Sequence, residues 1–245
     1  MRGKVYFLAI FLLLAGCWSS QEDKLLRDAK PFYDAASTAY QENQTDEALT
    51  NVRKAIEIYP NYVRAHILYQ ELMLKENSTR QLISEYHALL AKNRQNPLYH
   101  YLYGRLLSDL DMQYEEYKKA EDLDANFPWA HYGLGWAYFK RKQFDEATQE
   151  FEEAIRTDPT NAMFYNNLGA IYFFKGQYDE AIQELKKSVE LDPDYATPYH
   201  NLAWAYYKKG DFKMAEDMLE KFINRAPAGS TKDIAKEKLL QLRGK

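Results

Sequence analysis

Residues 162–195 read AMFYNNLGAIYFFKGQYDEAIQELKKSVELDPDY, and the main features of this stretch recur every 34 residues in the C-terminal half of the chain. Four residue types keep one register over three periods: Leu134, Leu168 and Leu202; Tyr138, Tyr172 and Tyr206; Ala147, Ala181 and Ala215; Pro159, Pro193 and Pro227. A fixed period of this length indicates a solenoid, in which each unit is a helix pair that buries its apolar face only by stacking on its neighbours. The sequence therefore predicts an all-α fold that presents an extended concave surface.

The pattern resembles the tetratricopeptide repeat, in which Leu-Gly, Tyr, Ala, an aromatic residue and Pro follow one another over 34 residues. The resemblance implies a right-handed superhelix, an α-solenoid of about six helix pairs with a C-terminal capping helix. Three units match strongly and three match weakly, and the third unit, of 31 residues, has a tightened inter-helix turn near Asp109–Met112. The expected units are 29–62, 63–96, 97–127, 128–161, 162–195 and 196–229, followed by the capping helix 230–245.

Small residues explain how each helix pair closes. We expect Gly135 and Gly169 to let the two helices of one unit approach closely. Ala147, Ala181 and Ala215 fall where the second helix crosses a neighbour, and a larger side chain there would overpack the contact. Gly176 and Gly210 fall at the turn between the helices, where a left-handed backbone favours glycine, and Lys142 replaces that glycine in its unit. The recurrent prolines end each second helix.

The N-terminus reads as a secretory leader. Arg2 and Lys4 precede an apolar run over residues 5–15, which is too short to span a membrane as a helix. The run ends in Leu-Ala-Gly-Cys, which resembles the lipobox of bacterial lipoproteins, and the resemblance implies cleavage before Cys17 and diacylation of that residue. We therefore expect a signal peptide at 1–16 and a lipidated tether at 17–28; the alternatives are a general secretory signal with a free thiol, or a buried initiating helix.

Composition excludes several classes of function. The 245 residues are 46% hydrophobic and 28% charged with a net charge of -4, so the clustered basic surface that nucleic-acid binding requires is not expected. His66, His100 and His131 occupy the fourth position of their units without the i, i+4 pair of a zinc-binding helix, so we expect no metal. The sequence has no Gly-x-Ser-x-Gly elbow and no phosphate loop, so we expect neither an enzyme nor a cofactor.

In tetratricopeptide folds the first helix of each unit lines the concave groove, through its second, fifth, sixth, ninth and twelfth positions. Asn167 and Asn201 match the sixth-position asparagine with which some family members hold a peptide backbone. Large aromatic residues share the face, a composition favoured at binding hot spots. The alternative is that some of these aromatics pack between units. The expected peptide-binding residues are Trp129, Tyr132, Trp136, Met163, Asn166, Asn167, Phe173, His200, Asn201, Trp204 and Tyr207.

Anchor and groove together predict a lipid-anchored scaffold or assembly factor of the bacterial cell envelope, which binds a protein or extended peptide on its concave face. Trp18 follows the lipidated cysteine where an aspartate would retain a lipoprotein in the inner membrane, which favours the outer membrane, facing the periplasm, in a Gram-negative cell. Two alternatives remain open: a structural homo-oligomer closed by the aromatic groove, and an accessory protein that stacks carbohydrate or peptidoglycan on the same rings.

Overall fold

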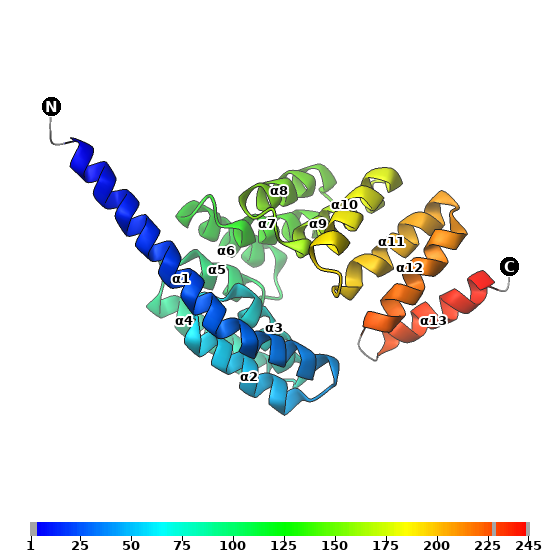
Figure 1. Ribbon diagram of the computed structural model, residues 1–245, viewed down its shortest axis with the longest axis horizontal. Coiled ribbons are helices and arrows are strands. Elements are labelled where there is room, and N and C mark those ends of the chain that lie inside the picture. Colours follow the sequence, from blue (N-terminus) through cyan, green and yellow to red (C-terminus); the bar gives the residue numbers. More distant parts are fainter. Residues whose placement is uncertain (1–3, 227–228, 244–245) are drawn as a thin grey trace. The chain divides into compact units, whose positions relative to one another are not determined.

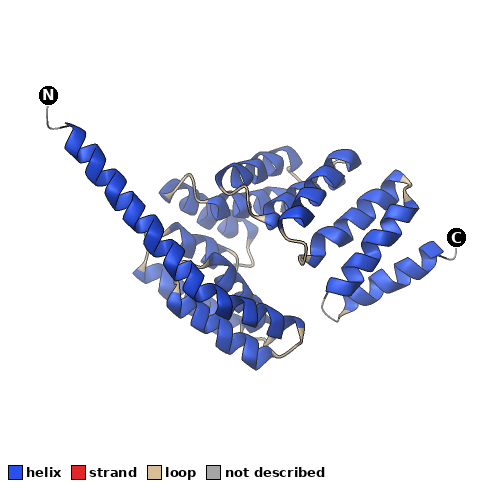
Figure 2. Cartoon of the chain, in the orientation of Figure 1, coloured by secondary structure: helices blue, strands red, loops and turns tan. Residues whose placement is uncertain are grey.

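The computed structural model describes the backbone of residues 4–226 and 229–243, and side chains within residues 21–226, 229 and 231–243. All regular structure in these residues is helical, which confirms the all-α prediction (Figures 1 and 2). The helices are α1 (Lys4–Gln41), α2 (Thr45–Ile58), α3 (Val63–Lys75), α4 (Thr79–Lys92), α5 (Pro97–Gly104), α6 (Leu110–Leu123), α7 (Pro128–Lys140), α8 (Phe144–Thr157), α9 (Ala162–Phe174), α10 (Tyr178–Leu191), α11 (Ala196–Lys209), α12 (Phe212–Arg225) and α13 (Ser230–Arg243).

The chain forms two compact units, residues 1–82 and residues 83–245. In the first unit α1 packs along α2, and the contact is made mainly of small residues: Ala29, Ala36, Ala39, Ala48, Val52 and Ala55 are all buried. Small side chains let two helix axes come close together. One helix thus runs through the sequence assigned to the leader, the tether and the first repeat helix, and the side chain of Cys17 lies outside the described residues. Within the described part of the chain, no helix combines the length and the apolar character needed to cross a membrane.

In the second unit consecutive helices pair as α5 with α6, α7 with α8, α9 with α10 and α11 with α12. The close approach predicted for two glycines is confirmed. A Cβ atom on Gly169 would lie 2.6 Å from Cγ of Leu185, and one on Gly135 would lie 3.0 Å from the ring of Phe151. A side chain at position 169 would force its neighbours to shift, and one at position 135 would require the Phe151 ring to move by a few tenths of an ångström, because packed interiors approach crystal density.

In five of the six repeat units, the turn inside the helix pair uses a left-handed residue at one repeat position; the turn between α5 and α6, which lies wholly within the described residues of the shortened unit 97–127, does not. Gly176 and Gly210 have φ angles of 79° and 84°, as the sequence predicts, and Lys142 adopts the same region with φ 61°. In the first compact unit Asn43 and Asn77 take this position with φ 58° and 56°. Asparagine is the residue that tolerates this conformation best after glycine, so lysine is the costliest occupant of the five.

The loops between repeat units are held by one recurring bond. The fourth residue of a unit contacts the carbonyl oxygen of the residue six positions earlier, at the end of the preceding unit. The contacts are His66 Nε2 to Pro60 (2.8 Å), His100 Nε2 to Arg94 (3.0 Å), His131 Nε2 to Ala125 (3.0 Å), Tyr165 Oη to Pro159 (3.2 Å) and Tyr199 Oη to Pro193 (2.9 Å). The histidines at this position therefore serve as hydrogen-bond donors to a loop carbonyl. A tyrosine hydroxyl can make the same bond, which explains why either residue occurs at this position.

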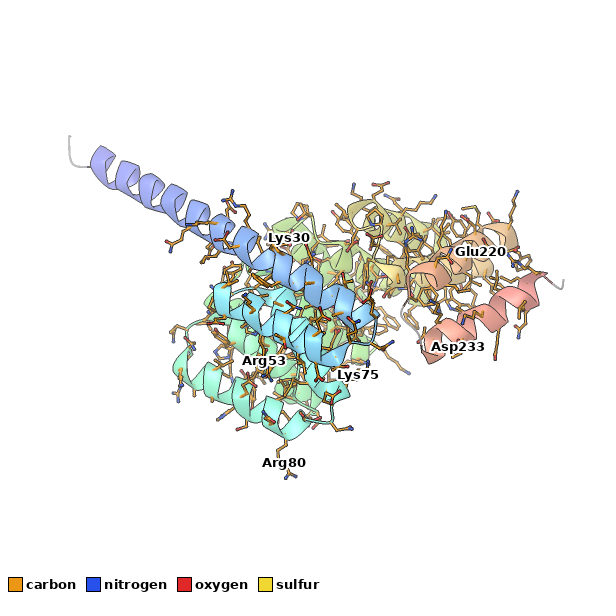
Figure 3. All side chains as sticks on the ribbon, turned by 60° about the horizontal axis from the view of Figure 1, so that its bottom comes forward. Lys30, Arg53, Lys75, Arg80, Glu220 and Asp233 are labelled. Atoms are coloured by element: carbon orange, nitrogen blue, oxygen red, sulfur yellow. The ribbon has the colours of Figure 1, made fainter. Side chains whose placement is uncertain are left out.

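Ion pairs repeat along the exposed edge of the second unit. Arg141 pairs with Asp111 at 2.5 Å, Lys175 pairs with Asp145 at 2.7 Å, and Lys209 pairs with Asp179, each pair separated by 30 residues. At the C-terminus Arg243 of α13 pairs with Glu216 at 2.6 Å and with Glu220, both on α12. Figure 3 shows Glu220 on α12. Exposed pairs of this kind contribute little free energy individually.

Candidate functional site

The first helices α7, α9 and α11 carry the predicted peptide-binding residues, and the structure divides these residues by depth. Trp129, Tyr132, Asn166 and Asn167 are buried in the second unit. The ring of Trp129 lies 5.2 Å from that of Phe164 and 5.4 Å from that of Tyr132, in edge-to-face geometry. Such ring pairs add to the stability gained from burial alone. These aromatic residues thus form part of the core between successive units.

The buried amides bond inside the protein. Asn167 donates from Nδ2 to the carbonyl oxygen of Met163 at 2.8 Å, within its own helix. Asn201 donates from Nδ2 to Oδ1 of Asn166 at 2.9 Å, which joins α11 to α9. A buried amide group must find such partners, because an unsatisfied one costs free energy. The donors expected to hold a peptide are therefore engaged with the protein in this structure.

The remaining predicted residues are half-buried and lie at the surface of α7, α9 and α11. They are Trp136, Met163, Phe173, His200, Asn201, Trp204 and Tyr207. Residues of this class keep part of a ring in solvent, as a contact surface requires. They separate into two groups, one around Trp136 and one around Trp204.

The first group continues into aromatic residues that the sequence reasoning did not select as binding residues. The ring of Phe139 lies 5.5 Å from Trp136 and 5.1 Å from Phe174, and Phe174 is 57% exposed. We call this group the aromatic strip; it comprises Trp136, Phe139, Phe144, Phe173, Phe174 and Tyr178. Phe144, Phe174 and Tyr178 lie outside the five groove positions, at the thirteenth and seventeenth positions of the repeat. In the sequence, the adjacent pair Phe173 and Phe174 was the signal that could have indicated this group.

A half-buried cation lies at the C-cap of α5, at the same repeat position as Trp136. Arg105 donates from Nη1 to the hydroxyl of Tyr101 at 3.3 Å, and its guanidinium lies 5.9 Å from the centre of that ring. Tyr101 is fully buried, and its burial raises the pKa of the phenol well above the usual range. The phenol therefore stays neutral and serves as a hydrogen-bond partner for Arg105.

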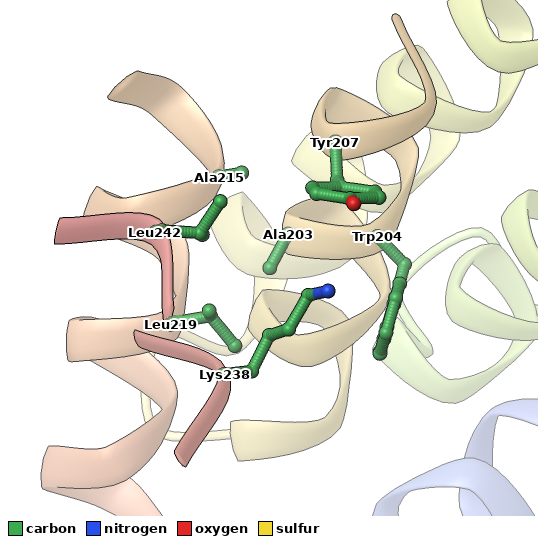
Figure 4. Close-up of a pocket in the computed structure, with 7 residues that line it drawn as sticks. All are labelled: Ala203, Trp204, Tyr207, Ala215, Leu219, Lys238 and Leu242. Carbon is green, nitrogen blue, oxygen red and sulfur yellow. The ribbon is translucent and has the colours of Figure 1, made fainter. Parts of the chain in front are cut away.

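The second group meets the last helix of the chain. Lys238 of α13 places its ammonium 4.3 Å from the ring centre of Tyr207 and 5.3 Å from that of Trp204 (Figure 4). The three residues line a small pocket that is completed by Ala203, Ala215, Leu219 and Leu242. Cation–π contacts of this geometry are favourable, so α13 covers part of the face that Trp204 would offer.

His200 fixes the orientation of Trp204. The indole Nε1 donates to Nε2 of His200 at 3.0 Å, so that nitrogen must carry a lone pair. Burial lowers the pKa of His200, and its bond with Asn201 opposes this shift only in part. The neutral imidazole is thus the form that holds Trp204.

Elsewhere in the second unit, Glu121, His131 and Glu150 are the described residues whose side-chain ligand atoms gather closely enough for a metal ion.

Comparison with known families identifies the repeat. The family model for the TPR repeat matches residues 135–176 and 171–210, and the model for the tetratricopeptide repeat matches residues 29–62 and 196–228. The chain thus carries tetratricopeptide repeats, and the solenoid of helix pairs predicted from the 34-residue period is confirmed. No curated protein matches the chain at a significant level.

Solved structures agree on the fold. The chain is similar to the crystal structure of the APC/C hetero-tetramer Cut9-Hcn1, with a TM-score of 0.64 and 21% identity, over 91% of this chain and 46% of that one. It is also similar to the MamA RS-1 ArsTM double mutant, with a TM-score of 0.51 and 22% identity, over 66% of this chain and 93% of that one. This chain spans less than half the length of the Cut9-Hcn1 chain, and identities this low indicate shared fold alone.

Proposed function

Because the chain is built of tetratricopeptide repeats, which generally serve protein–protein interaction, we propose that it is a lipid-anchored scaffold that binds a protein or extended peptide on the concave face of its repeats. The single observation that carries the binding role is the aromatic strip. It places half-buried rings beside the 57% exposed ring of Phe174 on consecutive repeats. Water-exposed aromatic clusters of this kind are rare on surfaces that bind nothing.

The binding surface that we propose is smaller than the full set of predicted residues. Trp136, Phe139 and Phe173 supply partly exposed rings, and Met163 adds a flexible apolar side chain on α9. Trp129 and Tyr132 are buried and belong to the core, so they are left out of this surface. A large aromatic surface supplies affinity with little loss of side-chain entropy, and its hot spots should concentrate where rings are packed on one side.

The test is in-cell photo-crosslinking from positions 136 and 174, with position 240 as the matched control. Leu240 is an apolar residue of α13 that is 68% exposed, and it lies outside the aromatic strip. The proposal expects one dominant envelope protein crosslinked from 136 and 174 but not from 240. A ladder of self-adducts would instead support a homo-oligomer. Peptidoglycan fragments that bind only while Trp136 is intact would support the carbohydrate alternative.

The anchor is a second part of the proposal. The sequence Leu-Ala-Gly-Cys after an apolar run supports diacylation of Cys17, and the burial of two acyl chains gives stable attachment. The tether at 17–28 is short and would hold the repeats close to the membrane, facing the periplasm on the outer membrane of a Gram-negative cell. Cys17→Ala should release the protein from membranes washed at alkaline pH. Retention of the variant in the washed membranes would contradict the lipid anchor.

A further inference from the structure

His131 has its ring orientation set from one side by the loop contact that recurs through the chain. Its Nε2 lies 3.0 Å from the carbonyl oxygen of Ala125, an acceptor, so Nε2 carries the proton. The ring is buried, and its Nδ1 atom faces the opposite way. A histidine that donates one ring nitrogen to a backbone carbonyl presents the other as an oriented ligand, which is the usual support for a metal-binding imidazole.

Two carboxylates from different helices converge on Nδ1. Oε2 of Glu150, on α8, lies 2.9 Å from Nδ1 of His131, and Oε1 of Glu121, on α6, lies 3.9 Å from it. The ligand atoms of the three residues all lie within 4.8 Å of one another. Both glutamate side chains are 20% exposed, so solvent reaches the edge of the group. Three helices from two successive repeats therefore aim one nitrogen and two oxygens at a common point.

Glu121 is a charged residue at a repeat position that is otherwise apolar. The residue four places before the loop carbonyl is aliphatic in every other unit: Ile56, Leu90, Ile155, Val189 and Ile223. A carboxylate that replaces a packing residue costs free energy unless a positive charge compensates it. Lys118 pairs with Oε2 of Glu121, whereas Oε1 faces the second carboxylate and is too far from His131 for a hydrogen bond.

The preceding repeat shows the same histidine without the second carboxylate. Nδ1 of His100 lies 2.7 Å from Oε2 of Glu116, and Lys119 pairs with the other oxygen of Glu116 at 2.7 Å. The position that corresponds to Glu121 is Leu90 in this case. Glu116 is thus shared between His100 and Lys119. The group at His131 differs from it by one added glutamate, which brings a second carboxylate oxygen to 3.9 Å from the ring nitrogen.

We propose that Glu121, His131 and Glu150 bind a divalent first-row transition-metal ion, with Zn²⁺ as the best fit. In a tetrahedral zinc site, metal–ligand distances near 2.0–2.2 Å place neighbouring ligand atoms about 3.3–3.6 Å apart. The two separations that involve His131, 2.9 and 3.9 Å, lie on either side of that range. The ligand atoms of the two glutamates lie within 4.8 Å of each other and would have to approach by up to about 1.2 Å to form the site. One nitrogen and two carboxylate oxygens suit Zn²⁺, and water would supply the fourth ligand. The ion would join two successive repeats.

The test is titration of untagged full-length chain with ZnCl₂ by calorimetry, after treatment with EDTA. The chain carries Cys17→Ser, which removes its only thiol. We expect one equivalent of Zn²⁺ to bind, and a bound Co²⁺ probe to show the intense visible bands of a four-coordinate site. Glu121→Ile restores the residue type of the other repeats, so this variant should fold and yet bind Zn²⁺ at least about 100-fold more weakly, a larger loss than an outer-shell change causes.

His100→Gln is the matched control, and it should bind Zn²⁺ like the parent chain. Zn²⁺ should also raise the Tm of the parent chain and of His100→Gln, and leave the Tm of Glu121→Ile unchanged. Two results would overturn the proposal: no saturable binding by the parent chain, or binding that Glu121→Ile retains at full strength.

Discussion

Asn201 and Asn166 form a side-chain hydrogen bond of 2.9 Å between neighbouring first helices, with Nδ2 of Asn201 as donor and Oδ1 of Asn166 as acceptor. Asn166 is buried and Asn201 is half-buried. The bond links the fifth position of one repeat to the sixth position of the next. Asn201, one of the two amides that resemble a peptide clamp, therefore joins one repeat to its neighbour.

Asn201→Ala should destabilise the protein by about 1–3 kcal/mol, because it leaves the buried Oδ1 of Asn166 without its donor. Urea unfolding followed by circular dichroism measures the change, and Thr197→Ala on the exposed side of α11 is the control. The double variant with Asn166→Ala should lose less than the sum of the single losses. Additive losses would show that the bond contributes nothing.

Trp129 and Trp136 lie on the same helix and were both expected to contact a partner, but they should respond differently to truncation. Trp129 is 5% exposed and packs on Phe164, so Trp129→Ala should cost about 3–5 kcal/mol of unfolding free energy. Trp136 is half-buried, and Trp136→Ala should cost about 1 kcal/mol. Denaturant unfolding compares the two variants. Equal losses would contradict the division of this face into core and surface.

Lys142→Gly should stabilise the protein by about 0.5–1 kcal/mol. Lysine at φ 61° carries a steric cost of about 1–2 kcal/mol, and glycine removes it at a smaller entropic cost. Thermal unfolding monitors the gain. Lys208→Gly, in the last turn of α11, should instead lose about 1 kcal/mol, because glycine disfavours a helix. A loss for Lys142→Gly would mean that the lysine side chain stabilises the turn by more than its backbone strain costs.

The 34-residue period was sufficient to predict the all-α solenoid and the details that depend on the backbone. It located the left-handed turns at Gly176 and Gly210, and the close approach at Gly169. These features follow from repeat position alone, because each position has a fixed place on its helix. The burial of a side chain is different, because it depends on which side chains the next unit places against it. Trp129 and Trp136 could therefore not be separated by sequence.

Contacts between units also escaped the sequence reasoning. A search for histidines at i, i+4 spacing tests one helix at a time, whereas Glu121, His131 and Glu150 come from three helices. Their separation along the chain depends on turn and loop lengths as well as on helix geometry. One signal was available: Glu121 occupies a position that is aliphatic in all the other units. Comparison of the repeats with one another, position by position, would have found it.

His66 makes the stability of the first compact unit depend on pH. The side chain is 2% exposed, and its burial lowers the pKa to about 4, against the opposing effect of its bond to the Pro60 carbonyl. An unfolded histidine titrates near 6.5, so between about pH 6.5 and 4 the unfolded chain binds a proton that the native state refuses. This contribution to stability is complete above pH 6.5 and is lost as the pH falls.

His66→Gln tests this dependence, because glutamine can still donate to the Pro60 carbonyl but does not titrate. Between pH 7.5 and 4.5 the parent chain should lose about 2–3 kcal/mol more unfolding free energy than the variant, at about 1.4 kcal/mol per pH unit below 6.5. Urea unfolding at four pH values gives the two slopes, and His87→Gln, at an exposed position of α4, should keep the slope of the parent chain. Parallel slopes for His66→Gln and the parent would mean that the native state accommodates a protonated His66, and that its burial does not control the acid stability of this unit.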